Sequence, residues 1–150
     1  MKDIGHLIVK VMKAQGLHSA DLGGKSDPFA VVEIVNDRLQ TQTELKTLAP
    51  VWQKVFTLYV TLILFDNLTN QQITLICFSD IRDIHDIVEI TVYDEDKDHK
   101  YEFLGRVQIP LLRVKNGERR WLKLKDKTLR KKAKGEEAEI LVELNLFWNP

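Results

Sequence analysis

Two acidic clusters, far apart in the chain, hold the side chains best suited to chemistry. Asp21 and Asp27 lie in the first cluster, and Asp94, Asp96 and Glu102 lie in the second. Each cluster begins where an apolar run ends, which predicts two loops at one edge of a sheet. Because two carboxylates about 4 Å apart repel by roughly 4 kcal/mol at an effective dielectric of about 20, their convergence indicates a bound cation. Hard oxygen ligands on flexible loops favour Ca²⁺ over Mg²⁺ or a transition metal.

The length and charge of the chain indicate the number of domains and limit the classes of partner. A chain of 150 residues is predicted to form one domain, 1–150, with a single core. Lys and Arg number 22, as do Asp and Glu, so the net charge identifies no partner. Balanced charge without an aromatic platform argues against nucleic-acid binding.

The positive side chains are concentrated in one stretch near the C-terminus. Its members are Arg119, Arg120, Lys123, Lys125, Lys127, Arg130, Lys131, Lys132 and Lys134. Such a run is usually a solvated surface. The functional alternative is attraction to anionic lipid, at about 1 kcal/mol for each nearby Lys or Arg.

Several function classes find no support in the sequence. The single cysteine, Cys77, has no partner for a disulfide or a metal motif, which indicates a reducing compartment. The four histidines lack zinc-ligand spacing, and neither a nucleophile elbow nor a phosphate-binding glycine loop is found. We therefore expect no enzyme and no small-molecule substrate. Without a signal-peptide core or an apolar run of about 20 residues, a soluble cytosolic domain is expected.

Short apolar runs with turn signals between them predict an all-β sandwich of eight antiparallel strands. The expected strands are 7–12, 29–35, 39–43, 55–58, 87–93, 103–109, 121–124 and 140–147. Antiparallel strands place both acidic loops at the same edge of the sandwich.

The segment 59–79 differs from its surroundings, because Asp66 is its only charged residue. We interpret it as an insertion, either an extra β-hairpin that extends the sheet or a long segment without a place in the core. Its origin as an alternative exon or a retained intron would be decided by sequencing the transcript. High β-propensity with low charge makes such a segment prone to aggregation if it is exposed.

Four stretches of the chain resemble C2 domains, most closely those of the multiple-C2-and-transmembrane proteins. These stretches are 16–29, 50–56, 84–96 and 103–111. The resemblance covers nearly the whole chain except 59–79. It implies an eight-stranded antiparallel β-sandwich of type II topology, in which the first strand leads directly into the first calcium loop. It also implies loops that bind Ca²⁺ and then the anionic phospholipid surface of a membrane.

The resemblance assigns ligand roles residue by residue. Asp21 and Asp27 match the ligands of the first loop, and Asp94 and Asp96 match the central pair of the later loop. Glu102 stands where the family usually has aspartate, and its longer side chain shifts the carboxylate. Arg38, Lys46 and Lys54 lie on the strands where some C2 domains bind phosphoinositides.

The sequence therefore predicts a domain that docks peripherally on cytoplasmic membrane surfaces when Ca²⁺ rises. Full-length relatives implied by the resemblance are anchored in the membrane. The alternative is a calcium-independent C2 domain that holds a protein partner through a strand edge or a basic face.

Overall fold

The computed structural model describes residues 2–19, 23–35, 37–66, 73–76, 86–96, 98 and 100–148. Nine strands and one 3-10 helix are found in this part of the chain. In chain order they are β1 (Lys2–Leu17), β2 (Pro28–Ile34), β3 (Asp37–Gln40), β4 (Val51–Asp66), β5 (Ile73–Ile76), β6 (Ile87–Glu95), β7 (Tyr101–Pro110), η1 (Leu111–Arg113), β8 (Arg119–Lys123) and β9 (Gly135–Trp148).

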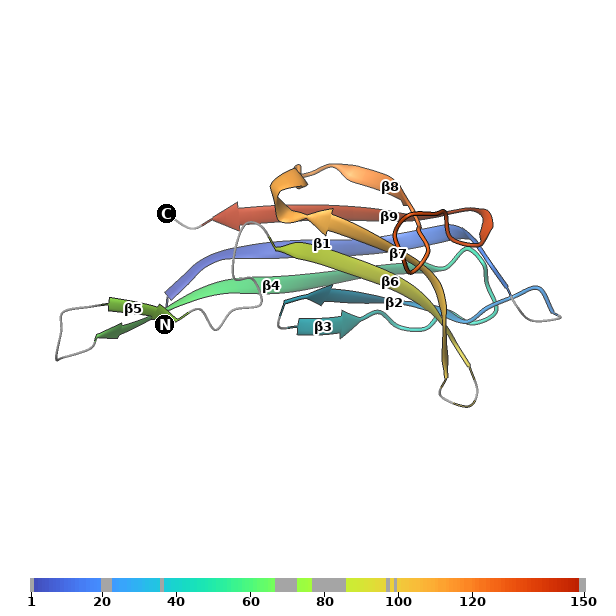
Figure 1. Cartoon of the computed structure of the whole chain (residues 1–150), viewed down its shortest axis with the longest axis horizontal. Helices are drawn as coiled ribbons and strands as arrows, with labels where there is room; N and C mark the ends of the chain where they lie inside the picture. Colours follow the sequence, from blue (N-terminus) through green and yellow to red (C-terminus); the bar gives the residue numbers. More distant parts are fainter. Residues whose placement is uncertain are drawn as a thin grey trace.

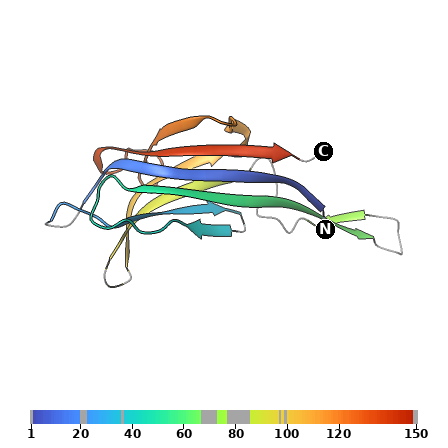
Figure 2. The same cartoon turned by 180° about the vertical axis from the view of Figure 1, so that it is seen from behind.

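The strands form two antiparallel sheets that pack face to face (Figure 1). One sheet has the order β5-β4-β1-β9-β8 and the other has the order β3-β2-β6-β7. Seen from behind, the long strands β1, β4 and β9 run side by side (Figure 2). The predicted all-β sandwich is thus confirmed, and each of the eight predicted strands overlaps an observed one.

The core lies between the sheets because inward-facing positions alternate with outward-facing ones along each strand. Leu7, Val9 and Val11 of β1 are fully buried. The alternating residues Val88, Ile90 and Val92 of β6 are equally inaccessible on the opposite sheet. Alternation of this kind is what a two-layer sandwich requires, since only one face of each sheet meets the core.

The segment 59–79 continues the sheet where the structure describes it. β4 runs on to Asp66, and β5 pairs with it from Ile63↔Ile76 to Asp66↔Ile73. The hairpin interpretation therefore holds for 59–66 and 73–76. Residues 67–72 and 77–79, including Cys77, lie outside the described residues.

The strand connections place the predicted loops together. β1 leads into the first acidic loop and β2 follows it, as expected for the type II strand order. β6 and β7 are neighbours in the second sheet and flank the second acidic loop. No helix in the described part of the chain has the length and apolar character that crossing a bilayer requires.

A row of charges crosses three strands on the outer face of the five-stranded sheet. Glu143 of β9 is paired in register with Lys10 of β1 and Arg119 of β8. Lys10 Nζ lies 3.0 Å from one Glu143 carboxylate oxygen, and Arg119 Nε lies 3.1 Å from the other. The Asn145 amide donates a further hydrogen bond of 3.0 Å to this carboxylate. These donors, Lys10 first, lower the pKa of Glu143 to about 2.

This cluster predicts a pH-dependent contribution to stability. A carboxyl whose folded pKa lies below its ordinary value of 4.5 stabilises the fold above that value, and the contribution is lost as the pH falls toward 2. Glu143→Gln is expected to lower the free energy of unfolding at neutral pH by about 2 kcal/mol. Its stability should also decline less than that of the wild type between those two pH values. Urea unfolding across this range measures both effects.

Glu136→Gln is the matched control for this prediction. It removes the same charge from an exposed position on the same strand. Equal losses in the two variants would show that net charge, and not the interstrand cluster, governs the acid sensitivity.

Candidate functional site

The ends of β2, β6 and β7 bring Asp27 of the first acidic loop beside Asp94 and Glu102 of the second. Asp27 immediately precedes β2, whose first residue, Pro28, pairs with Asp94 of β6. Asp94 pairs in turn with Glu102 of β7. Three of the five predicted ligands therefore lie in adjacent positions at one end of the four-stranded sheet.

Asp94 continues the inward-facing row of β6. Val88, Ile90 and Val92 alternate along the core face, and Asp94 follows at the next inward position. The residue is only 8% exposed, although it lies at the end of the strand. The sheet thus directs this carboxylate into the space between the two layers and away from bulk water.

Backbone amides hold the two central carboxylates in place. Asp27 N donates to Asp94 Oδ1 at 2.8 Å, which joins loops 67 positions apart in the sequence. Lys46 N donates to Asp27 Oδ1 at 2.6 Å. Glu95 N donates to the Asp27 carbonyl at 2.9 Å. The first two bonds fix the orientation of the carboxylates, which a preformed cation site needs, and the third joins the two loops through their backbones.

The second loop is closed at its base. Asp96 N donates to the Lys100 carbonyl at 3.0 Å, and the exposed Asp96 side chain lies beyond the end of β6. Thr43 Oγ1 donates to Glu95 from the neighbouring segment. The sequence did not predict the role of Thr43, because nothing in a local pattern indicates a contact between such distant residues.

An aromatic cluster supports this loop on the outer face of the sheet. The ring of Phe29 lies 5.1 Å from that of Tyr101, and the ring of Tyr93 lies 6.4 Å from that of Phe103. Phe29 and Tyr93 also stack at 5.8 Å. The three strands that carry the acidic residues are therefore tied together just before the loops begin. The sequence did not predict this support, although the aromatic residues beside both acidic clusters are a signal that could have indicated it.

The structure does not place the whole predicted ligand set. Asp21 lies outside the described residues. In the part of the chain that the structure describes, no group of three or more His, Cys, Asp or Glu side chains is arranged to hold a metal ion. Asp27 and Asp94 are brought into contact, while Asp96 and Glu102 are placed in the same loop region by β6 and β7.

No described contact brings together the side chains of the other basic candidate, which consists of Arg38, Lys46 and Lys54. Arg38 forms an ion pair of 3.4 Å with Glu33 of the adjacent strand. Lys46 contributes its backbone amide to Asp27, and Lys54 lies exposed on β4. No described interaction connects the three side chains as one site.

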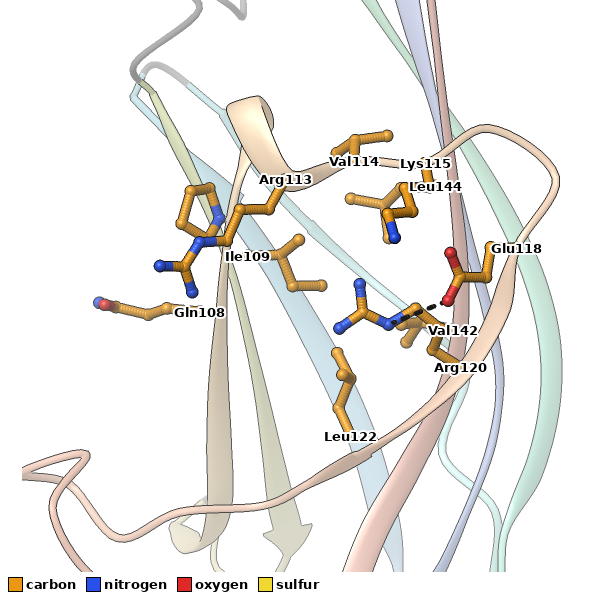
Figure 3. A pocket seen from close by; sticks show the side chains of 11 residues that line it. Gln108, Ile109, Arg113, Val114, Lys115, Glu118, Arg120, Leu122, Val142 and Leu144 are labelled. Carbon is orange, nitrogen blue, oxygen red and sulfur yellow. Dashed lines mark ion pairs between the residues drawn. The ribbon is translucent and has the colours of Figure 1, made fainter.

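A small cavity opens at the edge of the sandwich (Figure 3). It lies between β7, the edge strand of the four-stranded sheet, and β8, the edge strand of the five-stranded sheet. It has a volume of about 100 Å³ and is lined by Ile109, Leu122 and Leu144, among others. Arg120 and Glu118 form an ion pair of 3.7 Å at its mouth. Ligand pockets commonly enclose about 300–1,000 Å³, so this cavity is a packing gap rather than the functional site.

Comparison with known proteins decides the family. Residues 5–124 match the C2 domain family. The chain belongs to the C2 domain family. This family is one of binding modules and not a catalytic family.

Curated relatives match this C2 domain over almost its full length. It is 49% identical over 149 residues to the multiple C2 and transmembrane domain-containing protein of Drosophila melanogaster, covering 99% of this chain and 14% of that protein. The human multiple C2 and transmembrane domain-containing protein 1 is 45% identical, with 99% of this chain and 12% of that protein covered. The C2 domain thus spans about one seventh to one eighth of the length of these relatives.

A solved structure confirms the architecture. A C2 domain of plant extended synaptotagmin 1 superimposes with a TM-score of 0.71 at 27% identity, covering 100% of this chain and 99% of that one. The described C2 domain therefore has the fold of its family, with the acidic ends of β2, β6 and β7 at one end of it.

Proposed function

We propose that this C2 domain docks on anionic phospholipid membranes when its loops bind Ca²⁺. One observation carries the proposal most directly. The Asp27 amide donates to the Asp94 carboxylate, so one acidic residue from each of two distant loops lies at the same end of the sandwich. Membership of the C2 domain family supports the same conclusion.

The donor chemistry at this end suits Ca²⁺. The described ligand candidates Asp27, Asp94, Asp96 and Glu102 offer only carboxylate oxygens, and backbone carbonyls of the same loops add more. Ca²⁺ takes about 6–8 oxygen ligands in flexible geometry, which loops can supply. We assign Asp21 as the fifth carboxylate, contributed by the first loop.

The chain's own residues explain how an ion would switch membrane affinity. Without a cation, the clustered carboxylates repel anionic headgroups. A bound Ca²⁺ would supply positive charge and an open coordination position for headgroup oxygens. The amide-held carboxylates of Asp27 and Asp94 keep their orientation, so the switch is a change of electrostatic potential and requires no large change of shape.

Sedimentation with phosphatidylserine-containing vesicles tests the proposal. With phosphatidylserine vesicles, the protein is expected in the pellet at saturating Ca²⁺ and in the supernatant with EGTA. With neutral vesicles, it is expected in the supernatant both with Ca²⁺ and with EGTA. Folded protein that stays in the supernatant at every Ca²⁺ concentration would refute calcium-dependent docking. We place the working site at the cytoplasmic face of a membrane, peripherally bound.

A second candidate function is a calcium-independent interaction with a protein partner. Val51, Val55 and Tyr59 are each at least 50% exposed and share the outer face of β4. Apolar side chains in a row on a strand are typical of a contact surface. Binding to a partner that persists in EGTA, without vesicle binding in Ca²⁺, would favour this function over the first.

A further inference from the structure

The outer edges of the two sheets differ in how well they are protected against pairing with another chain. Natural proteins protect a sheet edge with charged side chains, proline, a bulge or a covering segment. In the part of the chain that the structure describes, the edge strands are β5 and β8 of one sheet and β3 and β7 of the other. Three of these strands carry such protection, whereas β5 carries none.

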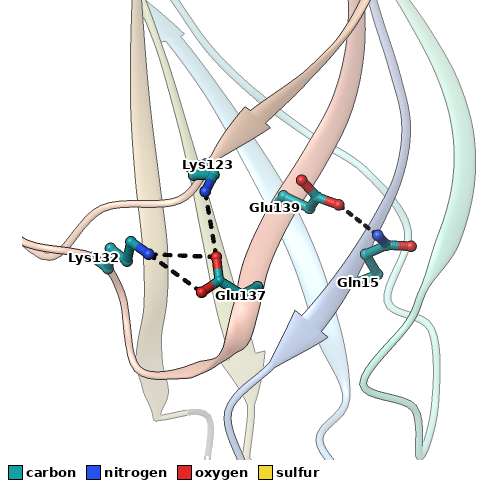
Figure 4. Close-up of polar contacts among 5 residues, drawn as sticks. All are labelled: Gln15, Lys123, Lys132, Glu137 and Glu139. Carbon is teal, nitrogen blue, oxygen red and sulfur yellow. Dashed lines mark hydrogen bonds and ion pairs between the residues drawn. The ribbon is translucent and has the colours of Figure 1, made fainter.

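Charge protects the edge that β8 forms. This strand carries positive charge at Arg119, Arg120 and Lys123. Lys123 Nζ lies 3.4 Å from Glu137 of β9, so charges of both signs lie beside this edge (Figure 4). An approaching strand would have to remove water from these charged groups, which disfavours pairing here.

The edges of the four-stranded sheet are protected in two ways. Two of the four residues of β3, Asp37 and Arg38, are charged. On the outer side of β7, Arg106 exchanges two backbone hydrogen bonds of 2.9 Å with Lys125, so this part of the edge is already paired. Another chain therefore meets charge or an occupied ladder at each of these two strands.

β5 lacks each of these protections. Its sequence from Ile73 to Ile76 is Ile-Thr-Leu-Ile, without a charge or a proline. The strand pairs with β4 in an unbroken register from Ile63↔Ile76 to Asp66↔Ile73, so no bulge interrupts it. β4 is the single neighbour of β5 among the described strands. A regular, neutral edge of this kind is a template for pairing with a further strand.

The β4–β5 pair also lies outside the core of the sandwich. In both views β5 lies beyond the ends of the strands of the four-stranded sheet, on the side away from the acidic loops (Figure 1, Figure 2). All paired residues of the two strands except Asp66 and Thr74 are Ile, Leu or Phe. No described strand of the other sheet covers them. In the proposed docking this end is turned away from lipid, which favours a protein as the partner.

We propose that β5 pairs with β5 of a second copy of this chain, so that two domains share one continuous sheet across a two-fold axis. A two-fold axis brings each residue of the edge near its own copy, and β5 has no charge that would be repelled there. A neutral edge equally offers a charged peptide no complementary charge. Each copy contributes its one unprotected edge, so the assembly closes at two chains.

The geometry of strand pairing fixes the centre of this interface. Residues directly opposite each other in an antiparallel pair point to the same face of the sheet. The axis must therefore pass through a pair of identical positions, and Thr74 or Leu75 is then opposite its own copy. In both registers, position 74 of the two copies lies on one face of the joined sheet and close to the axis.

The same pairing determines the shape of the dimer. Because the paired strands are antiparallel, the axis relates the domains end to end, and their acidic loops lie at opposite ends of the assembly. The maximum dimension of the dimer is then roughly twice that of one domain. A dimer formed through the exposed outer face of β4 would instead place the two sandwiches against each other and be much shorter.

Sedimentation equilibrium and small-angle X-ray scattering, with EGTA and without lipid, test the proposal. Wild-type protein is expected to form an elongated dimer with a Kd in the micromolar range, as a small interface implies. Thr74→Lys is expected to raise this Kd by at least about tenfold, because two like charges then meet beside the axis. Thr57→Lys is the matched control, since it adds the same charge at an exposed position inside the sheet on β4, and it should leave the Kd unchanged.

A charge exchange keeps the test independent of folding. Thr74→Glu alone should also be monomeric, and mixing it with Thr74→Lys should restore the dimer because opposite charges then meet across the axis. A mixture that stays monomeric would overturn the proposal, as would a wild-type protein that is monomeric at millimolar concentration.

Three further results would overturn the pairing of β5. A compact dimer that Thr57→Lys disrupts would place the interface on the outer face of β4. Open-ended assemblies would show that the edge does not close at two chains. Binding of wild-type protein to neutral vesicles that Thr74→Lys abolishes would assign the β4–β5 pair to lipid. None of these measurements uses Ca²⁺, so they leave the test of calcium-dependent docking separate.

Discussion

Asp94→Asn combined with Asp96→Asn is expected to abolish calcium-dependent sedimentation with phosphatidylserine vesicles. The double variant removes two of the negative ligands that set calcium affinity, and we expect that affinity to fall by at least about a hundredfold. The fold should persist, since an asparagine oxygen at position 94 still accepts the hydrogen bond from Asp27 N. Circular dichroism and thermal melting check the fold in the same samples.

The matched control for this prediction lies in the same loop. Glu95→Gln combined with Asp98→Asn removes an equal charge from positions that are not assigned as ligands. The control should retain calcium-dependent pelleting. Wild-type pelleting by the Asp94 and Asp96 variant, or loss in both variants, would contradict the assignment of these two carboxylates.

Gly16→Ala is expected to cause a large loss of stability. Gly16 has φ +70, and an added Cβ would lie 2.2 Å from the Glu136 carbonyl oxygen. The register of β1 against β9 shifts at this point, between Gln15 and Leu17. The backbones of the two strands approach so closely that no side chain fits, so we expect a loss of about 3 kcal/mol.

Gly117→Ala separates the cost of a left-handed backbone conformation from the cost of the steric contact with β9. Gly117 also has a left-handed φ, +78, but its Cβ would meet no atom within 4 Å. Conformational strain alone is expected to cost about 1 kcal/mol there. Urea denaturation compares the variants, and equal losses would show that backbone conformation, rather than the close approach of β1 and β9, limits position 16.

The positions of eight of the nine described strands along the chain were predictable, because alternating apolar residues mark core-facing positions. The strand lengths were not. β1 was predicted over 7–12 but runs from Lys2 to Leu17, because pairing with β4 and β9 extends it through residues of mixed polarity. β4 was predicted over 55–58 but begins at Val51 for the same reason. Tertiary pairing, and not local propensity, decides such strand ends.

The part of the candidate site that lies at strand ends was predictable from the sequence. Asp27, Asp94 and Glu102 lie at the ends of neighbouring strands, which the apolar runs had marked. The amide of Lys46 that holds Asp27 was not predictable, because it comes from an irregular segment with no periodic pattern. The assignment of all five carboxylates as calcium ligands stays a prediction.

The basic stretch shows a second limit of sequence analysis. By composition, its nine positive side chains are equivalent. The structure separates them, because Glu118, Glu137 and Glu143 compensate Arg119, Arg120, Lys123 and Lys132. Most of the remaining positive side chains lie on the segment that is shaped by the turn between Asp126 and Thr128. That turn depends on a side-chain hydrogen bond, which a local sequence pattern does not reveal.

The length of β4 has a consequence for how the domain would stand on a membrane. Its 16 residues, at about 3.3 Å per residue, correspond to roughly 50 Å. β5 pairs with its far end, away from the acidic loops (Figure 1). In the proposed docking, the β4–β5 pair therefore lies at the end of the domain farthest from the membrane-binding loops. A small tilt of the sandwich at the lipid surface would therefore displace β5 much farther than the acidic loops.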